Sequence, residues 1–273
     1  MTSMTAVEET IDAIVEEMQA MGSLVVAFSG GVDSGVVAAL GVRALGEKAR
    51  AVTAVSETLA GRELQEAQEV AEEIGIRHDL VQFSELDNPR FRENTPSRCF
   101  FCQSMRFDEI RGIAERLGVD VIASGTNASD LGDHRPGLEA MAQREVYQPL
   151  LAHGVDKEGV RAIARHLGLS IWDKPAMACL SSRIPHGTEV TDERLRRVEH
   201  AEDAVHALGF RQFRVRAHGD LGRVEIDAAE LPRALDPSMR RRLAAAVLQA
   251  GFTRTALDLA GFRSGSLNPP SSS

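Results

Sequence analysis

Short apolar runs alternate with segments of helical spacing along the first part of the chain. The runs predict buried strands at residues 24–28, 51–55, 78–83 and 119–123. Apolar residues at helical spacing predict helices at residues 7–18, 62–74, 99–117 and 157–167. Strands that alternate with helices in this way are typical of an α/β fold with a doubly wound parallel sheet.

The composition shifts near residues 185–188, and different elements follow. Gly219 and Asp220 join two runs in which apolar and polar residues alternate, as expected of a β-hairpin. Helices are predicted at residues 191–208 and 229–250, and strands are predicted at residues 213–217, 223–227 and 255–259. We therefore expect an α/β domain (1–186), a smaller C-terminal α+β domain (187–267) and a disordered tail of Pro and Ser (268–273).

The first predicted strand runs directly into Ser29-Gly30-Gly31, and an apolar helix is predicted from about Gly35. At such a junction backbone N–H groups and the positive helix end point at an anion, and glycine lets the backbone approach it closely. The loop contains no lysine, which excludes the phosphate loop of the form Gly-x-x-x-x-Gly-Lys-Ser/Thr. It also lacks the Gly-x-Gly-x-x-Gly spacing, which excludes a dinucleotide-binding turn. An ordinary strand-to-helix turn is the alternative, but Ser-Gly-Gly-x-Asp-Ser is much more specific than two glycines. A second polar turn, 124–127, follows the fourth predicted strand, where open sheets bind ligands.

Charge and composition exclude several classes of function. The 273 residues include 31 Lys and Arg against 40 Asp and Glu, a net charge of −9 with 4% aromatic residues. This balance argues against a general nucleic-acid binder. Residues 1–17 contain four glutamates and no basic residue, so we expect no secretory signal. No run of about 18 apolar residues predicts a membrane span, and a cytoplasmic protein is expected.

Three cysteines, in loops or at a helix start, form a second candidate site. Cys99 and Cys102 lie three residues apart, which puts both sulfur atoms on one side of a helix. Cys179 follows 77 residues later (179 − 102) in a predicted loop. Three thiolates suit an iron–sulfur cluster with one open iron, which we favour over zinc because no histidine has ligand-like spacing to a cysteine. The remaining alternative is that the three cysteines form no site and are unrelated small apolar residues.

The segment 29–34 resembles the pyrophosphate loop of the PP-loop ATP-pyrophosphatase superfamily, whose members split ATP between the α and β phosphates. The resemblance implies ATP and Mg²⁺ as cofactors. Asp33 would place the metal-bound phosphates, and the pyrophosphate would be held by Ser29, Gly30, Gly31 and Ser34. Four further residues would lie at the nucleotide: Ser56, Gly125, Thr126 and Asn127. Of these, Ser56 and Thr126 would contact the adenosine.

Further segments resemble the LarE family, the sulfur transferases of nickel-pincer cofactor biosynthesis, over nearly the whole chain. They are residues 125–127, 131–137, 174–185, 213–218 and 257–265. The family uses ATP to adenylate a carboxylate of pyridinium-3,5-biscarboxylic acid mononucleotide, and sulfur then displaces AMP to give a thiocarboxylate. The resemblance implies this substrate, a sulfide donor and a homo-oligomer. Neither a nucleic acid nor a membrane is expected as a partner.

The family contains two kinds of sulfur donor. In one branch a single cysteine, at the place of Cys179, gives up its own sulfur and becomes dehydroalanine. In the other branch three cysteines hold a [4Fe–4S] cluster, and a sulfide on the open iron is the donor. Because Cys99 and Cys102 accompany Cys179, the chain resembles the cluster branch. These three cysteines, as cluster ligands, and Asp33 are the expected catalytic residues.

A substrate with a phosphate and two carboxylates needs a cationic pocket within an acidic protein. Arg214 and Arg216 alternate along a predicted strand, so both fall on one strand face, and Arg183 follows Cys179 by four residues. Arginine binds phosphate and carboxylate through paired hydrogen bonds, so we expect these three arginines to hold the substrate. A solvated strand face is the alternative. The resemblance adds three residues to this site: Ser182, Glu202 and Glu225. The two glutamates would orient the arginines.

Three rival functions remain open. A tRNA thiolase can also join a pyrophosphate loop to a three-cysteine cluster, although the net charge of −9 weighs against binding tRNA. An NAD or GMP synthetase of the same superfamily would not need the three cysteines. A nucleotide-binding regulatory protein with a structural zinc would contain zinc without iron or sulfide.

Overall fold

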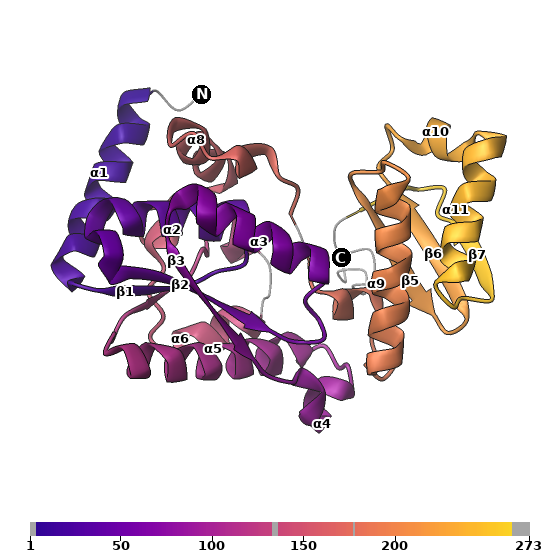
Figure 1. Cartoon of the computed structure of the whole chain (residues 1–273), viewed down its shortest axis with the longest axis horizontal. Coiled ribbons are helices and arrows are strands. Elements are labelled where there is room, and N and C mark those ends of the chain that lie inside the picture. Colours follow the sequence, from indigo (N-terminus) through magenta and orange to yellow (C-terminus); the bar gives the residue numbers. More distant parts are fainter. Residues whose placement is uncertain (1–3, 133–135, 177, 264–273) are drawn as a thin grey trace. The chain divides into compact units, whose positions relative to one another are not determined.

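The computed structural model describes residues 4–132, 136–176 and 178–263. The chain divides into two compact units, one of Met1–Glu85 and Cys99–Met177 and the other of Leu86–Arg98 and Ala178–Ser273 (Figure 1). This division differs from the sequence-based boundary at residue 186, since residues 86–98 and 178–186 pack with the second unit. The predicted tail, 268–273, lies outside the described residues.

Hydrogen bonds of the Asn94 side chain explain why residues 86–98 join the second unit, although the rest of that unit begins only at residue 178. Asn94 is fully buried, and its Nδ2 donates to the carbonyls of Pro185 and Thr188, each at 2.8 Å. Its Oδ1 accepts a hydrogen bond from Arg98 Nη1 at 2.6 Å. These bonds join segments about 90 residues apart, a distance that no local sequence pattern reveals.

The sheet of the first unit is parallel, and its strand order is β3-β2-β1-β4. Its strands are β1 (Leu24–Ala27), β2 (Ala49–Val55), β3 (Arg77–Gln82) and β4 (Ile122–Ala123). The predicted doubly wound parallel sheet is confirmed. The fourth strand is shorter than the predicted 119–123, because the amide of Val119 instead closes the end of the preceding helix by donating to the Ala114 carbonyl (2.9 Å).

Helices and short 3-10 turns complete the first unit. The helices are α1 (Met4–Met21), α2 (Val32–Leu45), α3 (Gly61–Ile74), α5 (Arg98–Leu117), α6 (Pro136–Ala142), α7 (Pro149–Ala152) and α8 (Lys157–His166). The 3-10 turns are η1 (Gly46–Lys48), η2 (Glu85–Asp87), η3 (Ala128–Gly132) and η4 (Ser170–Asp173). Two of the helices differ from expectation. Helix α2 begins before Gly35. Helix α6 falls where a loop is predicted, because Leu138 and Met141, three residues apart, pack into the core.

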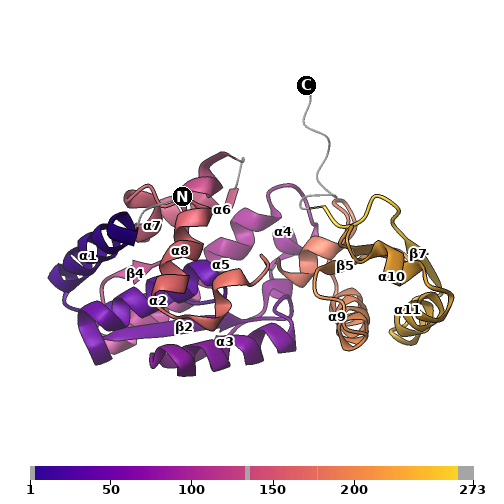
Figure 2. The same cartoon turned by 90° about the horizontal axis from the view of Figure 1, so that it is seen from above.

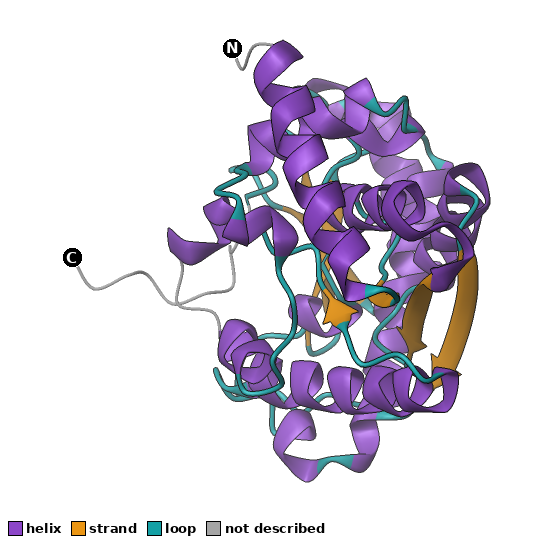
Figure 3. Cartoon of the chain, turned by 90° about the vertical axis from the view of Figure 1, so that its left-hand side faces the viewer, coloured by secondary structure: helices purple, strands orange, loops and turns teal. Residues whose placement is uncertain are grey.

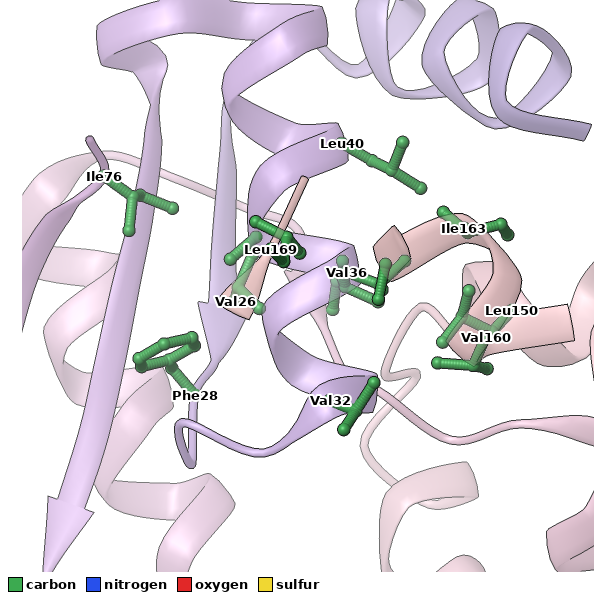
Figure 4. Packing of buried hydrophobic residues seen from close by; sticks show 14 of the residues in the cluster. Val26, Phe28, Val32, Val36, Leu40, Ile76, Leu150, Val160, Ile163 and Leu169 are labelled. Atoms are coloured by element: carbon green, nitrogen blue, oxygen red, sulfur yellow. The ribbon is translucent and has the colours of Figure 1, made fainter. Parts of the chain in front are cut away.

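Alternate residues of β1 face two different cores, as the two-residue period of a strand requires. Leu24 and Val26 pack with α1, α2, α3 and α8, whereas Val25 packs with α5. Figure 4 shows Val26, Val36 of α2 and Val160 of α8 in the first of these cores. Helices therefore cover both faces of the sheet (Figure 3), and α1, α2 and α8 pack together on one face (Figures 1 and 2).

The second unit is built on a three-stranded sheet of order β5-β6-β7. The strands are β5 (Phe213–His218), β6 (Leu221–Ile226) and β7 (Arg254–Leu257), and the other elements are α4 (Pro89–Arg92), η5 (Leu180–Arg183), α9 (Asp192–Ala207), α10 (Leu231–Leu235) and α11 (Pro237–Gln249). The predicted hairpin is confirmed, since His218 pairs with Leu221 across the Gly219-Asp220 turn.

The helix predicted over 229–250 is interrupted at Asp236, whose carboxylate caps α11 by accepting from the Ser238 amide at 2.9 Å. Among the described residues, no helix combines the length and apolar character needed to cross a bilayer.

Candidate active site

Each strand of the parallel sheet leads into polar residues at the same edge. Ser29 follows β1, Ser56 follows β2, Glu85 follows β3, and the turn 124–127 follows β4. Because the four strands are parallel, these residues lie at the carboxyl edge, where open α/β sheets bind ligands. Sequence reasoning singled out all of them except Glu85.

The phosphate loop closes on itself between β1 and α2. Ser29 Oγ lies 3.1 Å from Ser34 Oγ and accepts from the Gly31 amide at 3.4 Å. Ser34 Oγ donates to the Gly31 carbonyl at 3.2 Å. Gly31 is the N-cap of α2 and offers no side-chain cap, so the first amides of the helix remain available to a ligand. Such a loop can hold phosphate oxygens.

Two glycines are required by close backbone approaches around this loop. Gly30 has a φ of +66°, and a Cβ there would lie 2.5 Å from Ala67 Cα in α3. A Cβ on Gly125 would lie 2.6 Å from the Ser34 amide nitrogen. Larger residues at either position would force the backbone apart. The structure thus brings the turn 124–127 directly against the first turn of α2.

Asp33, in the first turn of α2, is held from two sides. Asn127 Nδ2 donates to Asp33 Oδ1 at 3.1 Å, and Lys157 Nζ lies 2.5 Å from Asp33 Oδ2. The Asp33 and Lys157 side chains are 28% and 33% exposed, so this ion pair is open to solvent and to a ligand. Asn127 was expected beside the nucleotide, whereas no sequence pattern singled out Lys157.

A second lysine reaches the loop from the segment that follows η4. Lys174 Nζ donates to the Gly30 carbonyl at 3.0 Å and lies 2.8 Å from Glu66 Oε2 of α3. It therefore fixes the peptide that carries the positive φ. Sequence reasoning missed this residue also, although the rarity of lysine in this chain is a signal that could have found both.

Glu85 gathers four donors at the ends of β2 and β3 and on α5. Its fully buried carboxylate accepts from Ser56 Oγ (2.7 Å), Thr58 Oγ1 (2.5 Å), Cys102 Sγ (2.9 Å) and Arg106 Nε (3.2 Å). Burial alone raises the pKa of Glu85, but the Arg106 charge and the bonds from Cys102, Thr58 and Ser56 outweigh it. The pKa therefore lies below its usual value, and the group is an anion at neutral pH.

This network connects two of the predicted site residues, Ser56 and Cys102, through one carboxylate. Thr126, the other predicted adenosine contact, lies 3.1 Å from Ser124 through their hydroxyl oxygens. Both Ser56 and Thr126 are buried.

The cysteines are divided between the two units. Cys99 is exposed and Cys102 is buried in the first turns of α5, whereas Cys179 belongs to the second unit and is half-buried. Cys179 Sγ lies 3.1 Å from Ser181 Oγ. Within the described ranges, no group of three or more His, Cys, Asp or Glu side chains is arranged to hold a metal ion.

Arg183 is fully buried in the second unit and makes paired hydrogen bonds to Glu202. Its Nε and Nη2 donate to the two carboxylate oxygens of Glu202, each at 2.9 Å. Its Nη1 donates to the carbonyls of Ala178 and Cys179 and to Ser182 Oγ. Arg183 therefore ties α9 to the backbone on both sides of the Cys179 side chain.

Arg216 forms the second buried pair, with Glu225 of the neighbouring strand. Arg216 Nε lies 3.0 Å and its Nη2 2.9 Å from Glu225 Oε2, while its Nη1 donates to the Ser182 carbonyl at 3.0 Å. Ser182 thus connects the Arg183–Glu202 and Arg216–Glu225 pairs. Glu202 and Glu225, the glutamates expected to orient arginines, thus each contact one arginine, and their role toward a substrate stays a prediction.

Arg214 occupies the same strand as Arg216, with its guanidinium 5.1 Å from the centre of the Phe262 ring. Arg214 and Arg216 are both buried. Burial lowers the pKa of the nearby His218, and the charges of Arg223 and Arg216 lower it further, whereas the charge of Glu225 raises it. Arginine is a usual partner of phosphate and carboxylate groups, which is the chemistry expected of this site.

Comparisons with known proteins agree with this arrangement. Residues 6–94 match the asparagine synthase family. An uncharacterized protein of Synechocystis sp., slr1717, is 42% identical over 243 residues, which cover 89% of this chain and 91% of that protein. The solved NMN synthetase from Francisella tularensis matches 62% of this chain and 75% of its own with a TM-score of 0.51 and 19% identity, a likeness of fold alone.

Two relatives carry names that describe sulfur chemistry. The tRNA-specific 2-thiouridylase MnmA of Azorhizobium caulinodans is 30% identical over 68% of this chain and 57% of its own length. The pyridinium-3,5-bisthiocarboxylic acid mononucleotide synthase of Lactiplantibacillus plantarum is 33% identical over 269 residues, 98% of this chain and 96% of that protein. Because that match spans nearly all of both proteins, the chain belongs to the LarE family of ATP-using sulfurtransferases with a PP-loop fold.

Proposed function

We propose that the protein adenylates a carboxylate of pyridinium-3,5-biscarboxylic acid mononucleotide and converts it to a thiocarboxylate in nickel-pincer cofactor biosynthesis. The observation that carries this proposal is the closed loop from Ser29 to Ser34, in a chain that matches a bisthiocarboxylic acid mononucleotide synthase over 96% of that protein's length. A carboxylate is a poor acyl donor because oxide would have to leave. Attachment to AMP supplies a leaving group.

In the first step a carboxylate oxygen of the substrate attacks the α-phosphorus of ATP, and the bond to the β-phosphate oxygen breaks. Pyrophosphate leaves and acyl-adenylate remains. The loop residues Ser29, Gly30, Gly31 and Ser34 hold the departing pyrophosphate, and Asp33 holds the Mg²⁺ that accompanies it. The nucleotide lies along the strand ends at Ser56, Gly125, Thr126 and Asn127.

In the second step a sulfur nucleophile attacks the acyl carbon, and the bond to the AMP oxygen breaks. The proposed resident group is a [4Fe–4S] cluster on Cys99, Cys102 and Cys179, which supplies sulfide when bound. The donor set fits in its chemistry, because thiolates are the usual ligands of such clusters. Cys102 now donates to Glu85, so ligation would replace that hydrogen bond.

The substrate's phosphate and carboxylates are assigned to the second unit. Arg214 and Arg216 provide charge-assisted hydrogen bonds to these anions. Ser182, Arg183, Glu202 and Glu225 complete the site, and the two glutamates orient Arg183 and Arg216, which they contact in the structure. We further expect a homo-oligomer in the cytoplasm that receives sulfide from a separate donor.

Cys179 as a sacrificial sulfur donor is the second candidate chemistry. The observation in its favour is that Cys179 is only half-buried, so its sulfur is accessible without the other two cysteines. This route would transfer the Cys179 sulfur and leave dehydroalanine after a single turnover. Modification of tRNA, as in the MnmA relatives, is disfavoured by the net charge of −9.

Anaerobic purification followed by iron and acid-labile sulfide assays tests the cluster. ATP-dependent sulfur transfer to the pyridinium mononucleotide tests the reaction, and intact-protein mass after the reaction separates the two donors. Dehydroalanine at Cys179, with full activity in Cys99→Ala, would overturn the cluster proposal in favour of the sacrificial route. A gel shift with bulk tRNA at physiological salt tests the rival substrate.

A further inference from the structure

Lysine is rare in this chain, and two of its three copies lie at the phosphate loop. The sequence contains 28 arginines but only Lys48, Lys157 and Lys174. Lys157 contacts Asp33 and Lys174 contacts Gly30. The loop itself contains no lysine, unlike the phosphate loop whose own lysine reaches the β and γ phosphates.

We infer that Lys157 is a phosphate-binding residue of the ATP site, which pairs with Asp33 when the nucleotide is absent and moves to the polyphosphate when ATP binds. Lys174 is a positioning residue that holds the Gly30 carbonyl away from the phosphates. This inference rests on the proposed use of ATP at the loop. It assigns to two distant segments the positive charge that the loop sequence lacks.

The environment of Lys157 allows this exchange of partners. Its ion pair with Asp33 is about one third exposed on each side, and pairs of that kind contribute little net stability. A polyphosphate carries several negative charges, so it competes well for the ammonium group. Transfer of Lys157 also leaves Asp33 Oδ2 available to the magnesium ion that accompanies ATP.

The backbone of Lys157 is fixed by the same turn that contacts Asp33. The Lys157 amide donates to Ser129 Oγ at 3.0 Å, and the Ser129 amide donates to Asn127 Oδ1 at 3.0 Å. Asn127 in turn donates to Asp33. Only the flexible side chain of Lys157 therefore has to move, while its Cα stays beside the loop.

Helix α8 also positions the second lysine. Arg161, one turn after Lys157, donates to the carbonyls of Trp172 (2.6 Å) and Lys174 (2.9 Å). The helix packs on α2 through Val160 and Ile163, in the core that also contains Val36 (Figure 4). One rigid helix thus sets both lysines relative to the phosphate loop.

Lysine and arginine differ in the way this site requires. An ammonium group is a compact point charge with three rotatable donors, whereas a guanidinium is a planar fork that favours fixed paired contacts. A group that passes from a carboxylate to a phosphate oxygen benefits from the compact form. This accounts for lysine at residue 157 in a chain that otherwise uses arginine almost throughout.

The small number of lysines makes the test direct. The protein is acetylated with an amine-selective reagent, with and without Mg²⁺ and α,β-methylene ATP, and each lysine is followed by peptide mass spectrometry. Calorimetry on the same sample measures binding of the analogue. We expect the analogue to slow acetylation of Lys157 several-fold and to leave exposed Lys48 unchanged, with Lys174 slow in both states because its side chain is only 16% exposed.

Matched variants complete the test. Lys157→Met should raise the Kd of the analogue by about tenfold or more, the usual effect of losing a charged hydrogen bond, whereas Lys48→Met should not change it. Thermal unfolding checks that both variants fold. Unchanged acetylation of Lys157 while calorimetry shows saturation, or an unchanged Kd in Lys157→Met, would overturn the lysine inference alone. Failure of the unaltered protein to bind the analogue would instead overturn the proposed function.

Discussion

The buried pair between Arg183 and Glu202 gives the sharpest prediction about stability. Glu202→Gln removes the negative charge but keeps the side-chain shape. The Arg183 guanidinium, which is fully buried, then loses its counter-charge, and one of the two oxygens that accept its 2.9 Å bonds is replaced by an NH2 group, which is a donor. Breaking one side of a buried pair costs about 3–5 kcal/mol.

Glu202 also accepts a hydrogen bond from the Val215 amide in β5 at 2.9 Å, so the loss should be felt in that strand. Because each 1.4 kcal/mol is about tenfold in an equilibrium constant, amide exchange in residues 213–226 should accelerate by about a hundredfold to several thousandfold. Hydrogen–deuterium exchange with peptide mass spectrometry measures this effect. Peptides from β1, in the other unit, should keep their exchange rates.

Two further variants decide whether the cause is electrostatic. Glu193→Gln makes the same chemical change at an exposed position of α9, and it should alter exchange less than about fivefold. Arg183→Met combined with Glu202→Leu removes both charges and should recover most of the protection, because no buried charge is left unpaired. An acceleration below tenfold in Glu202→Gln would refute the reasoning.

Three other predictions concern the phosphate loop, the arginines and pH. Gly30→Ala should abolish ATP binding in calorimetry, because the added Cβ would meet the α3 backbone at 2.5 Å with a φ of +66°; normal binding would refute the close packing. Arg216→Ala should weaken binding of the pyridinium mononucleotide by tens-fold with ATP affinity unchanged, and an equal loss for both ligands would refute the assignment. Hydrogen bonds from His153 and Tyr147 lower the pKa of Glu17 in the folded protein. Glu17 therefore stabilises the fold at pH values above its unfolded pKa near 4.5. This contribution disappears as the pH falls through the lower pKa of the folded state. Urea midpoints should therefore separate the unaltered protein from Glu17→Gln at pH 7 and converge once the pH has fallen below the lowered pKa of Glu17; equal midpoints at pH 7 would contradict this.

The parallel sheet and its phosphate loop could be predicted because their signals are local. The residues of β1 and β2 are almost continuously apolar, as expected of strands covered on both faces. Ser-Gly-Gly then marks the turn into α2 within a few residues. The β5–β6 hairpin was equally accessible, since Gly219 and Asp220 lie between two alternating runs.

The contacts that complete the site could not be predicted in the same way because they join distant segments. Lys157 meets Asp33 across 124 positions and Lys174 meets Gly30 across 144. Glu85 lies in a polar stretch without periodicity, and only the fold brings Ser56 and Cys102 to its carboxylate. The arginine–glutamate pairing was foreseen only through resemblance, since composition alone describes Glu202 and Glu225 as surface carboxylates.

The central claim is ATP-dependent transfer of sulfur to a carboxylate, and one measurement tests it directly. Anaerobically purified protein is incubated with Mg²⁺, ATP, sulfide and pyridinium-3,5-biscarboxylic acid mononucleotide, and the nucleotide products and the pyridinium product are quantified together. We predict one AMP and one pyrophosphate for each thiocarboxylate formed, dependence on Asp33, and more than one turnover per protein with the mass of Cys179 unchanged. ADP and orthophosphate as the main products, or ATP cleavage without sulfur in the pyridinium product, would contradict the account.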